Sequence, residues 1–518
     1  TDDWHLNVLA GFNGNERKYN YQDSEITNLT IPTWYNLTNT ADKPTIDSYQ
    51  RTQRLMGVLG QAEVAFKNMV YLTLTARNDW SSTLPRGSRS YFYPGATASW
   101  ILSEMLPESV KKTVNYAKLR AAWGKTGNDA LPYMVKTVYP QGSASSSGWG
   151  TSKFPFTNGN WNAYTVGNTL GGSTLSPEMT TEFEVGLNMA FLANRLSFDA
   201  SFYNRTSDHQ IFSLDMDAAS GYLYQNMNLG EIRNRGVELV VSGTPVKLKD
   251  FAWDVTWNFT KNWSKVISLP EELGGESSIY GLTGGTGLYA IKGEELGVFK
   301  ALRDPATGKV VVDNQGLPIR NPKQQIVGSM NYKYTMGINN TFTYKGVSLS
   351  VDVDIRQGGK MFSRTKNITY FTGNAMQTAY NSRNPWIIPN TVVQNGTDAQ
   401  GKPVYVDNNT PLNATSIYKF WDDGGLEMGA GDLIDKSYIK LRAITLSWAL
   451  PKKWLANTFL TDVRLSAFGN NLFLWTPAEN TFVDPELTSF GNDLRGNFGE
   501  WSANPSSRKF GFNVSVKF

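Results

Sequence analysis

The last nine residues of the chain, 510–518, alternate without a break between apolar and polar side chains. Because successive side chains of a strand point to opposite faces, one face of this segment carries five large apolar residues and ends on Phe518. Transmembrane β-barrels have such strands, since one face meets lipid and the other meets a hydrated lumen. The edge strand of a soluble β-sandwich alternates in the same way, so this segment alone leaves both architectures open.

The composition favours the membrane architecture. The 518 residues contain no apolar run of about 18, the length that a transmembrane helix needs. The mean hydropathy is −0.36, although 13% of the residues are aromatic and 47 are glycine. This mixture is typical of strands that are apolar on one face and are joined by long polar loops. The absence of cysteine excludes disulfides and thiolate metal sites, and the small, scattered net charge of +4 argues against nucleic-acid binding.

The same alternation recurs along the chain. It is clearest at 347–356, where five apolar residues alternate with Ser, Asp and Arg. We therefore predict an all-β fold, a transmembrane antiparallel β-barrel with about 14 strands in this chain. The predicted strands are 4–12, 54–67, 70–77, 91–102, 115–125, 182–191, 196–203, 233–243, 251–260, 334–345, 347–356, 438–450, 463–475 and 510–518.

The two faces of these strands differ in chemistry. Aromatic residues near the strand ends of the apolar face predict a lipid-facing girdle, namely Trp100, Trp253, Trp257, Trp448 and Phe518. Charged residues of the opposite face are expected to line the lumen or to contact a plug domain, namely Glu182, Glu184, Asp352, Asp354 and Arg356.

Counting back from Phe518, the connections alternate between long and short. The tight turns are 67–69, 192–195 and 345–346, and the long loops are 13–53, 126–180, 263–333, 357–433 and 476–506. Outer-membrane barrels have short periplasmic turns and long extracellular loops. The rhythm therefore predicts a multi-pass outer-membrane protein whose C-terminus is periplasmic and whose long loops face outward.

Several segments, in order along nearly the whole chain, carry a resemblance to a known family. They include ARNDWSSTLPRGSRSYFYPGATASWILSE (76–104), AKLRAAWGKTGN (117–128), NLGEIRNRGVELVVSGTPVK (228–247), YKGVSLSVDVDIRQGGKMF (344–362) and DKSYIKLRAITLSWALPKKW (435–454). With these segments the chain resembles the SusC/RagA-type TonB-dependent outer-membrane transporters of Bacteroidetes. The resemblance implies a barrel of about 22 strands filled by an N-terminal plug. Residues 1–518 would be its C-terminal portion, without the plug, and the closing strand would need a first strand from the missing part.

The resemblance also implies a function. Members of the family import oligosaccharides, and some import peptides, driven by the proton-motive force through TonB. A SusD-like surface lipoprotein caps the barrel as a lid. The expected partners are therefore this lipoprotein, TonB through the missing N-terminal part, the plug-bearing remainder of the protein, lipid and the solute.

Import requires binding and no bond chemistry, so we expect no enzyme activity and no cofactor. The two histidines, His5 and His209, are 204 residues apart in the sequence, and no Ser/His/carboxylate trio stands out. Asp422 and Asp423, with Asp432 further along, are acidic enough for calcium, but the EF-hand pattern is missing and a solvated loop is the better interpretation.

Aromatic side chains of the long loops are candidate platforms for sugar rings or peptide side chains. They are Trp149, Trp161, Tyr164, Tyr280, Tyr289, Tyr370, Phe371, Trp386 and Trp421. The alternative for each is packing within its own loop or against the lid. Two other functions stay open beside import: a soluble or surface glycan-binding β-protein, such as an adhesin or lectin, and a passive channel of about 14 strands.

Overall fold

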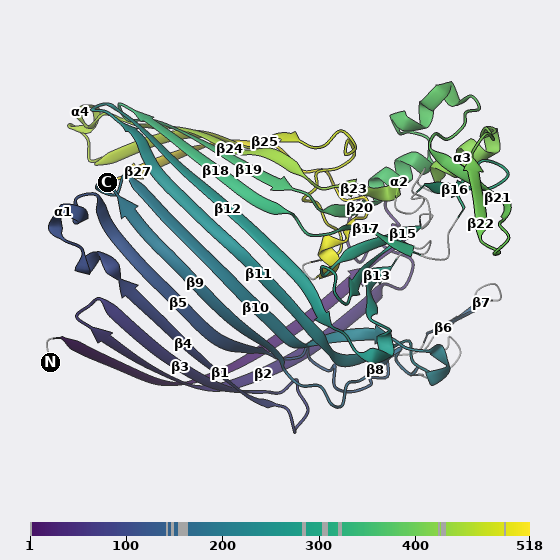
Figure 1. Ribbon diagram of the computed structural model, residues 1–518, viewed down its shortest axis with the longest axis horizontal. Helices are drawn as coiled ribbons and strands as arrows, with labels where there is room; N and C mark the ends of the chain where they lie inside the picture. Colours follow the sequence, from purple (N-terminus) through teal and green to yellow (C-terminus); the bar gives the residue numbers. More distant parts are fainter. Residues whose placement is uncertain are drawn as a thin grey trace. The chain divides into compact units, whose positions relative to one another are not determined.

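The computed structural model describes residues 3–140, 143–146, 150–153, 164–281, 286–302, 309–319, 324–422, 425, 431–491 and 494–518. Within this part of the chain the dominant element is a 15-stranded sheet, in which the long strands follow one another in chain order (Figure 1). Its long strands are β1 (Trp4–Glu25), β2 (Thr45–Phe66), β3 (Val70–Ser81), β4 (Ser90–Ile101), β5 (Val114–Asn128), β9 (Glu178–Phe191), β10 (Leu196–Asp215), β11 (Tyr224–Lys247), β12 (Phe251–Ser268), β18 (Tyr334–Tyr344), β19 (Val347–Gln357), β24 (Tyr438–Ala449), β25 (Asp462–Trp475) and β27 (Lys509–Lys517). The short β8 (Thr169–Leu170) adds to β11 in parallel.

Every predicted strand coincides with one of these, which confirms the all-β, antiparallel prediction. The strands reach further towards the long loops than predicted. Residues 13–25 and 45–53, predicted as loop, continue β1 and β2, whose pairing runs from Trp4↔Phe66 to Glu25↔Thr45. The alternation fades there because both faces become polar, so the sequence pattern ends before the hydrogen-bonded ladder does.

The chain divides into two compact units. The first comprises residues 1–100, 120–184 and 205–231 and contains the paired strands β1 to β4. Its loops enclose a small core formed by Leu84, Tyr91, Ala130 and Leu175. Asp79 is buried beside this core and pairs with Arg77, whose Nε lies 2.7 Å from Oδ1 of Asp79.

The second unit comprises residues 101–119, 185–204 and 232–518. Within it β12, β18, β19, β24, β25 and β27 pair in that order. The helix α4 (Lys452–Leu455) lies beyond one end of β24 and β25, and β20 (Lys360–Ser363) and β23 (Leu433–Asp435) lie beyond the other (Figure 1). We call the end of these strands near β20 and β23 the loop side, and the opposite end the turn side.

The tight turns occur where they were predicted. Lys67 and Asn68 have φ of 51° and 53°, and Lys345 and Gly346 have φ of 45° and 87°. Two-residue hairpin turns need positive φ because their twist must match that of the flanking strands. The connection 103–114 holds the 3-10 helix η1 (Leu102–Met105) and the single helical turn α1 (Glu108–Lys111).

The long loops of the second unit are folded, with their own sheets and cores. Leu288, Phe299, Met330, Phe362, Leu433 and Phe498 form one core, and Ile388, Leu412, Ile417 and Phe420 form another. The loops of the first unit contain η2 (Ala218–Ser220) and the short strands β6 (Ser143–Ser146) and β7 (Gly150–Lys153), and those of the second unit contain η3 (Glu271–Leu273), α2 (Arg364–Phe371), η4 (Met376–Arg383), α3 (Ala414–Asp422) and η6 (Leu494–Asn497). The short strands of the second unit are β13 (Glu276–Gly281), β14 (Gly287–Ile291), β15 (Val298–Leu302), β16 (Val310–Val312), β17 (Gln324–Ser329), β21 (Thr391–Thr397), β22 (Pro403–Asp407) and β26 (Gly499–Glu500).

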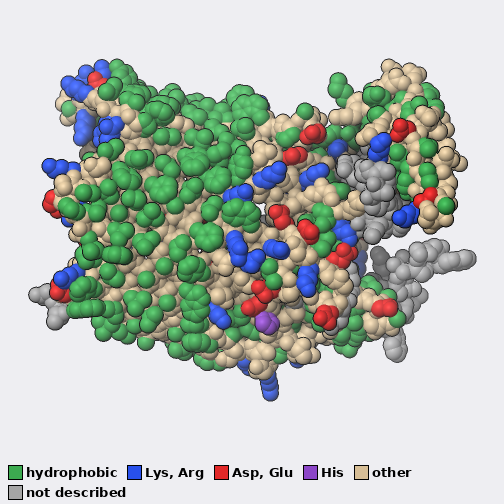
Figure 2. Space-filling view, viewed as in Figure 1, with side chains coloured by type: hydrophobic (Ala, Val, Ile, Leu, Met, Phe, Trp, Pro, Cys, Tyr) green, Lys and Arg blue, Asp and Glu red, His purple; other side chains and the backbone are tan. Residues whose placement is uncertain are grey.

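The apolar face of the long strands is exposed. Phe510 and Phe512 of β27 are 74% and 88% exposed, and Phe518, which directly follows the strand, is 87% exposed. Figure 2 shows hydrophobic side chains spread over the strands, whereas lysine, arginine and acidic side chains gather towards the strand ends. Among the described helices, none combines the length and apolar character needed to cross a bilayer.

Candidate functional site

Two neighbouring strands of the second unit bring charged side chains to one face at the loop side. β19 contributes Asp354 and Arg356, and β24 contributes Tyr438 and Lys440. The register pairs Asp354 with Lys440 and Arg356 with Tyr438. Because directly paired residues of an antiparallel ladder point to the same face, these four side chains are neighbours.

A β-bulge at Arg442 adds another cation. The register moves from Val353↔Leu441 to Asp352↔Ala443, so Arg442 has no partner on β19. One extra residue shifts the alternation by one position and leaves Arg442 and Ala443 on the same face. The guanidinium of Arg442 thereby reaches Asp354 and donates a hydrogen bond to its carboxylate.

The loop between β25 and β27 supplies the central carboxylate, Glu486. Arg442 donates to both of its oxygens, with N···O distances of 2.7 and 2.8 Å, and the hydroxyl of Tyr438 donates to Oε1 at 2.7 Å. Lys440 donates to Glu486 and also to Asp484, where the Nζ···Oδ2 distance is 2.7 Å. We call these seven residues the ion-pair cluster: Asp354, Arg356, Tyr438, Lys440, Arg442, Asp484 and Glu486.

The three cations and the three carboxylates of the ion-pair cluster balance in charge. The side chains of Lys440 and Asp484 are only 3% and 5% exposed, so their charges need partners. Burial alone would raise the pKa of Glu486, but the hydrogen bonds from Arg442, Lys440 and Tyr438 outweigh it and hold the pKa well below its usual range. Such a satisfied network fastens the loop to the strand ends, since removing one member would leave a buried charge unpaired.

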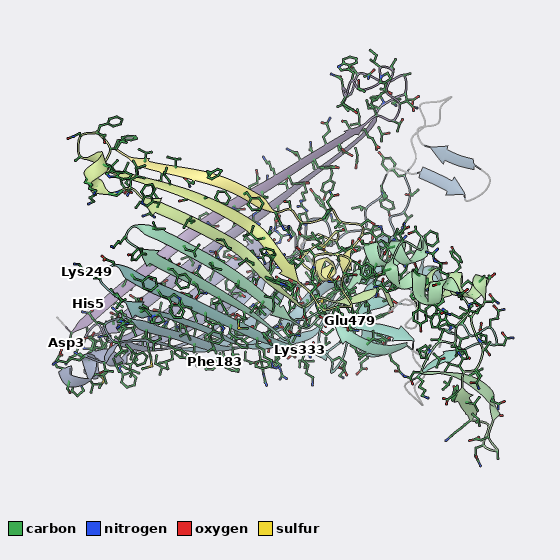
Figure 3. All side chains as sticks on the ribbon, turned by 90° about the horizontal axis from the view of Figure 1, so that it is seen from above. Asp3, His5, Phe183, Lys249, Lys333 and Glu479 are labelled. Carbon is green, nitrogen blue, oxygen red and sulfur yellow. The ribbon has the colours of Figure 1, made fainter. Side chains whose placement is uncertain are left out.

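A cavity of about 300 Å³ opens beside the ion-pair cluster. Its wall includes Tyr332, Arg356, Lys436 and Glu486. The ammonium of Lys436 lies 4.2 Å from the centre of the Tyr332 ring. Burial, reinforced by the nearby Arg356, lowers the pKa of Lys436 to about 8. Figure 3 labels Lys333 and Glu479 at this end of the strands and Lys249 at the turn side.

A second cavity of about 460 Å³ lies along the same loop. Its wall includes Thr365, Leu474, Asn480, Phe482 and Asp484. Asp484 is already engaged by Lys440, whereas the buried side-chain nitrogen of Asn480 has no hydrogen-bond partner among the described residues. The second cavity therefore offers polar contacts without an excess of charge.

Four of the predicted aromatic platforms pack inside the loops. The Tyr280 ring lies 4.7 Å from that of Phe498, and Tyr370 lies 5.3 Å from Trp421. Trp386 and Trp421 lie 5.3 and 4.8 Å from Phe420. This is the alternative of packing within the loop, although the edges of partly exposed rings remain available, so their role as ligand contacts stays a prediction.

The other predicted platforms are more open. Tyr164 is 71% exposed and Phe371 is also exposed, whereas Tyr289 is half-buried, with the ammonium of Lys300 at 4.8 Å from its ring centre. Trp149 and Trp161 lie outside the described residues.

The charges predicted to line the lumen are mostly paired. In the first unit, Glu182 accepts a hydrogen bond from Arg205 at 2.6 Å, and Glu184 lies 3.6 Å from Arg120. In the second unit, Asp352 accepts from Asn339 on β18. Asp354 and Arg356 belong to the ion-pair cluster, which is where the structure brings predicted site residues together.

The predicted girdle residues lie on the apolar face. Trp253 stacks on Phe342 and donates its Nε1–H to Asn340 with an N···O distance of 3.2 Å. Trp257 stacks on Phe259, and Trp448 contacts Trp454 of α4. Trp100 is 39% exposed. Their contact with lipid stays a prediction.

Asp432 is a further buried carboxylate, between α3 and β23. One of its oxygens accepts from Asn367 at 2.9 Å, and the other has no partner among the described residues. Burial raises the pKa of Asp432 to about 7. No group of three or more potential metal ligands occurs within the described ranges, and Asp423 lies outside them.

The comparisons with known proteins agree with this geometry. Residues 1–472 match the family model described as "TonB dependent receptor-like, beta-barrel". The chain belongs to this family. It is therefore part of an outer-membrane β-barrel of a non-enzymatic family.

Individual relatives support the assignment. The chain is 25% identical to TonB-dependent receptor P3 of Formosa agariphila over 99% of its own length and 50% of that protein. It is 27% identical to TonB-dependent receptor SusC of Bacteroides thetaiotaomicron over 53% of its own length and 27% of that protein. The solved structure of the RagAB peptide transporter superposes with a TM-score of 0.74 at 19% identity, covering 100% of this chain and 53% of that one, which shows the shared fold. The chain thus spans about half the length of the relatives it matches.

One feature of the sequence of this TonB-dependent receptor barrel could have predicted part of the ion-pair cluster. In 438–450 the apolar residues occupy odd positions up to Leu441 and even positions from Ile444 onwards. A change of phase inside a strand predicts a bulge, and the bulge is at Arg442. The contributions of Asp484 and Glu486 have no such sign, because loop residues follow no period.

Proposed function

We propose that this chain forms the C-terminal part of the wall of a TonB-dependent transporter that imports oligosaccharides or peptides across the outer membrane. Two observations together carry the proposal. The family match covers most of the chain, and the strands are apolar on one face and charged on the other. A lipid-exposed wall around a hydrated lumen requires this division.

The loops support a binding role. They are folded around their own cores, and the ion-pair cluster fastens one of them to the ends of β19 and β24. Pre-organised loops lose little conformational freedom when a solute binds, which favours affinity. Both cavities lie along this fastened loop.

The finer parts of the proposal rest on likeness alone. One similar structure is that of a peptide transporter, and the resemblance to SusC-type proteins adds oligosaccharides as the other solute class. A SusD-like lipoprotein lid and energy supplied through TonB belong to the same proposal. The plug and the TonB-contacting segment would lie in the part of the protein that the relatives have in addition.

The test is growth and uptake in the source bacterium. A deletion of the gene should abolish growth on one class of sole nutrient, an oligosaccharide or a peptide mixture, and leave growth on the corresponding monomers unchanged. Deletion of TonB should reproduce the defect. Uptake that persists without TonB would instead indicate a passive channel, and growth unaffected on every oligomer would reject import.

A further inference from the structure

Lys436 is a buried cation without a counter-ion. It is only 4% exposed, and among the described residues its ammonium takes part in no hydrogen bond and no ion pair. Its ammonium lies against the face of the Tyr332 ring, and Arg356 lines the same cavity. A cation–π contact compensates the desolvation of a buried ammonium only in part. An anion close to Lys436 would therefore be stabilising.

The backbone makes room for this lysine. Gly359 has φ of 84°, and a Cβ at that position would lie 2.5 Å from Cε of Lys436. The amide of Lys436 also donates to the carbonyl of Gly359 at 3.0 Å. A side chain at position 359 would therefore displace the lysine from the cavity.

Arg356 is a second cation on the same wall. Its Nε is buried and has no hydrogen-bond partner among the described residues. Its Nη2 lies 3.4 Å from Glu486 and 3.9 Å from Asp354, both of which already receive shorter hydrogen bonds from Arg442. The carboxylates of the ion-pair cluster are thus largely satisfied before Arg356 and Lys436 are considered.

Among the described residues, the cavity wall and the adjoining ion-pair cluster together carry one positive charge in excess. The four cations Arg356, Lys436, Lys440 and Arg442 face the three carboxylates Asp354, Asp484 and Glu486. A single monoanion would balance this excess. Met361, Leu487 and the ring of Tyr332 contribute apolar surface to the wall, which suits the body of a solute.

We propose that this cavity binds a carboxylate group carried by the imported solute, with the ammonium of Lys436 and the guanidinium of Arg356 as the recognising groups. The inference rests on the proposed function and names a chemical class within it. A carboxylate carries the single charge that the wall lacks, whereas a phosphate dianion would exceed it. The group has two sources: the C-terminus or an acidic side chain of a peptide, and a uronic acid of an oligosaccharide.

The experiment uses the full-length transporter purified in detergent and three matched pairs of probes. They are sodium acetate against sodium chloride at equal ionic strength, an N-acetylated alanine tripeptide against its C-terminal amide, and glucuronate against glucose. Thermal shift and calorimetry are measured for wild type, for Lys436→Met and for Lys333→Met, which alters an exposed lysine at the same end of the strands (Figure 3). Heat-modifiable migration on gels verifies that each variant retains its barrel.

Acetate should raise the melting temperature of wild type and Lys333→Met and leave Lys436→Met unchanged. One charged solute, the tripeptide or glucuronate, should bind at least about tenfold more tightly than its neutral partner, corresponding to about 1.4 kcal/mol. Lys436→Met should abolish this preference, and the preferred pair identifies the source. Equal responses to charged and neutral probes, or a preference that survives in Lys436→Met, would overturn the inference. Import without carboxylate preference rejects only this inference, whereas carboxylate binding without import rejects only the proposed function.

Discussion

Lys440 and Lys436 lie four positions apart and are buried to the same degree, yet their surroundings differ completely. Lys440 donates to Asp484 and Glu486 within a network that also holds Arg442 and Tyr438. Lys436 contacts the face of the Tyr332 ring and lines a cavity with Arg356, and among the described residues it has no ion-pair partner. Burial by itself therefore says little about the role of a charge. The first lysine holds a loop in place, and the second is available to a ligand.

Substitution of each lysine in turn should give the largest difference in local stability between the two positions. Lys440→Met leaves Asp484 and Glu486 without their shared cation, and we expect a loss of about 4 kcal/mol in the local free energy of unfolding. Lys436→Met removes a charge without a counter-ion and should be neutral or stabilising. Hydrogen exchange of the amides of residues 476–491 measures both effects. Equal losses in the two variants would contradict the distinction.

The carboxylate at the centre of the cluster gives the next largest effect. Glu486→Gln should weaken protection of the same amides by about 3 kcal/mol at neutral pH. Because the folded pKa of Glu486 is lowered, its contribution is present above the unfolded pKa of about 4.3 and is lost as pH falls below it. Wild type should therefore approach the variant in acid. A difference that stays constant down to pH 2 would argue against the ionic origin.

Asp432 extends the comparison to a buried acid with an incomplete set of partners. Its folded pKa is raised to about 7, so its favourable contribution is complete below about pH 4 and is lost as pH rises through 7. We expect the local stability of α2 to fall by about 2 kcal/mol across this window relative to Asp432→Asn, in which the window should be flat. Hydrogen exchange of residues 364–371 at several pH values measures the difference.

The charge of Lys436 can be removed by pH as well as by mutation. Tyr332, Arg356 and Glu486 are the ionisable groups that share its cavity wall, and Asp435 precedes it in the chain. Since the folded pKa of Lys436 is lowered to about 8, the stability of wild type should rise relative to Lys436→Met by about 2 kcal/mol between pH 8 and about 10.4. Thermal melts across this range test it, and parallel curves for both proteins would contradict it.

The smallest effect on stability is expected for the hydrogen bond between Trp253 and Asn340, a polar contact on the apolar face of the strands. Trp253→Phe removes the hydrogen bond to Asn340 while keeping the ring contact with Phe342, and should cost about 1 kcal/mol. Trp257→Phe, whose ring also stacks on a phenylalanine, is the matched control. Urea unfolding in lipid compares the two, and equal losses would show that the Asn340 contact contributes nothing.

The strand network was predictable because alternation reports the faces of a strand directly. Asp354 and Arg356 were assigned to the polar face from their positions, and they lie there within the ion-pair cluster. Their partners Lys440 and Arg442 were missed because a bulge breaks the pattern at Arg442. Tyr280 and Trp386 were predicted as platforms, with packing inside their loops as the alternative. Their rings pack against loop cores, and their contact with a ligand stays a prediction, since composition alone does not distinguish the two roles.

The sequence by itself determined the strands, their tight turns and their apolar face, because each depends on residues near one another in the chain. Alternation with a period of two marks all three. Only the tertiary structure decided which charges meet. Glu486 reaches Arg442 and Lys440 across more than forty residues of loop and strand, and Lys436 faces Arg356 from another connection. Such contacts depend on how a loop folds back onto strand ends, and no local period encodes that path.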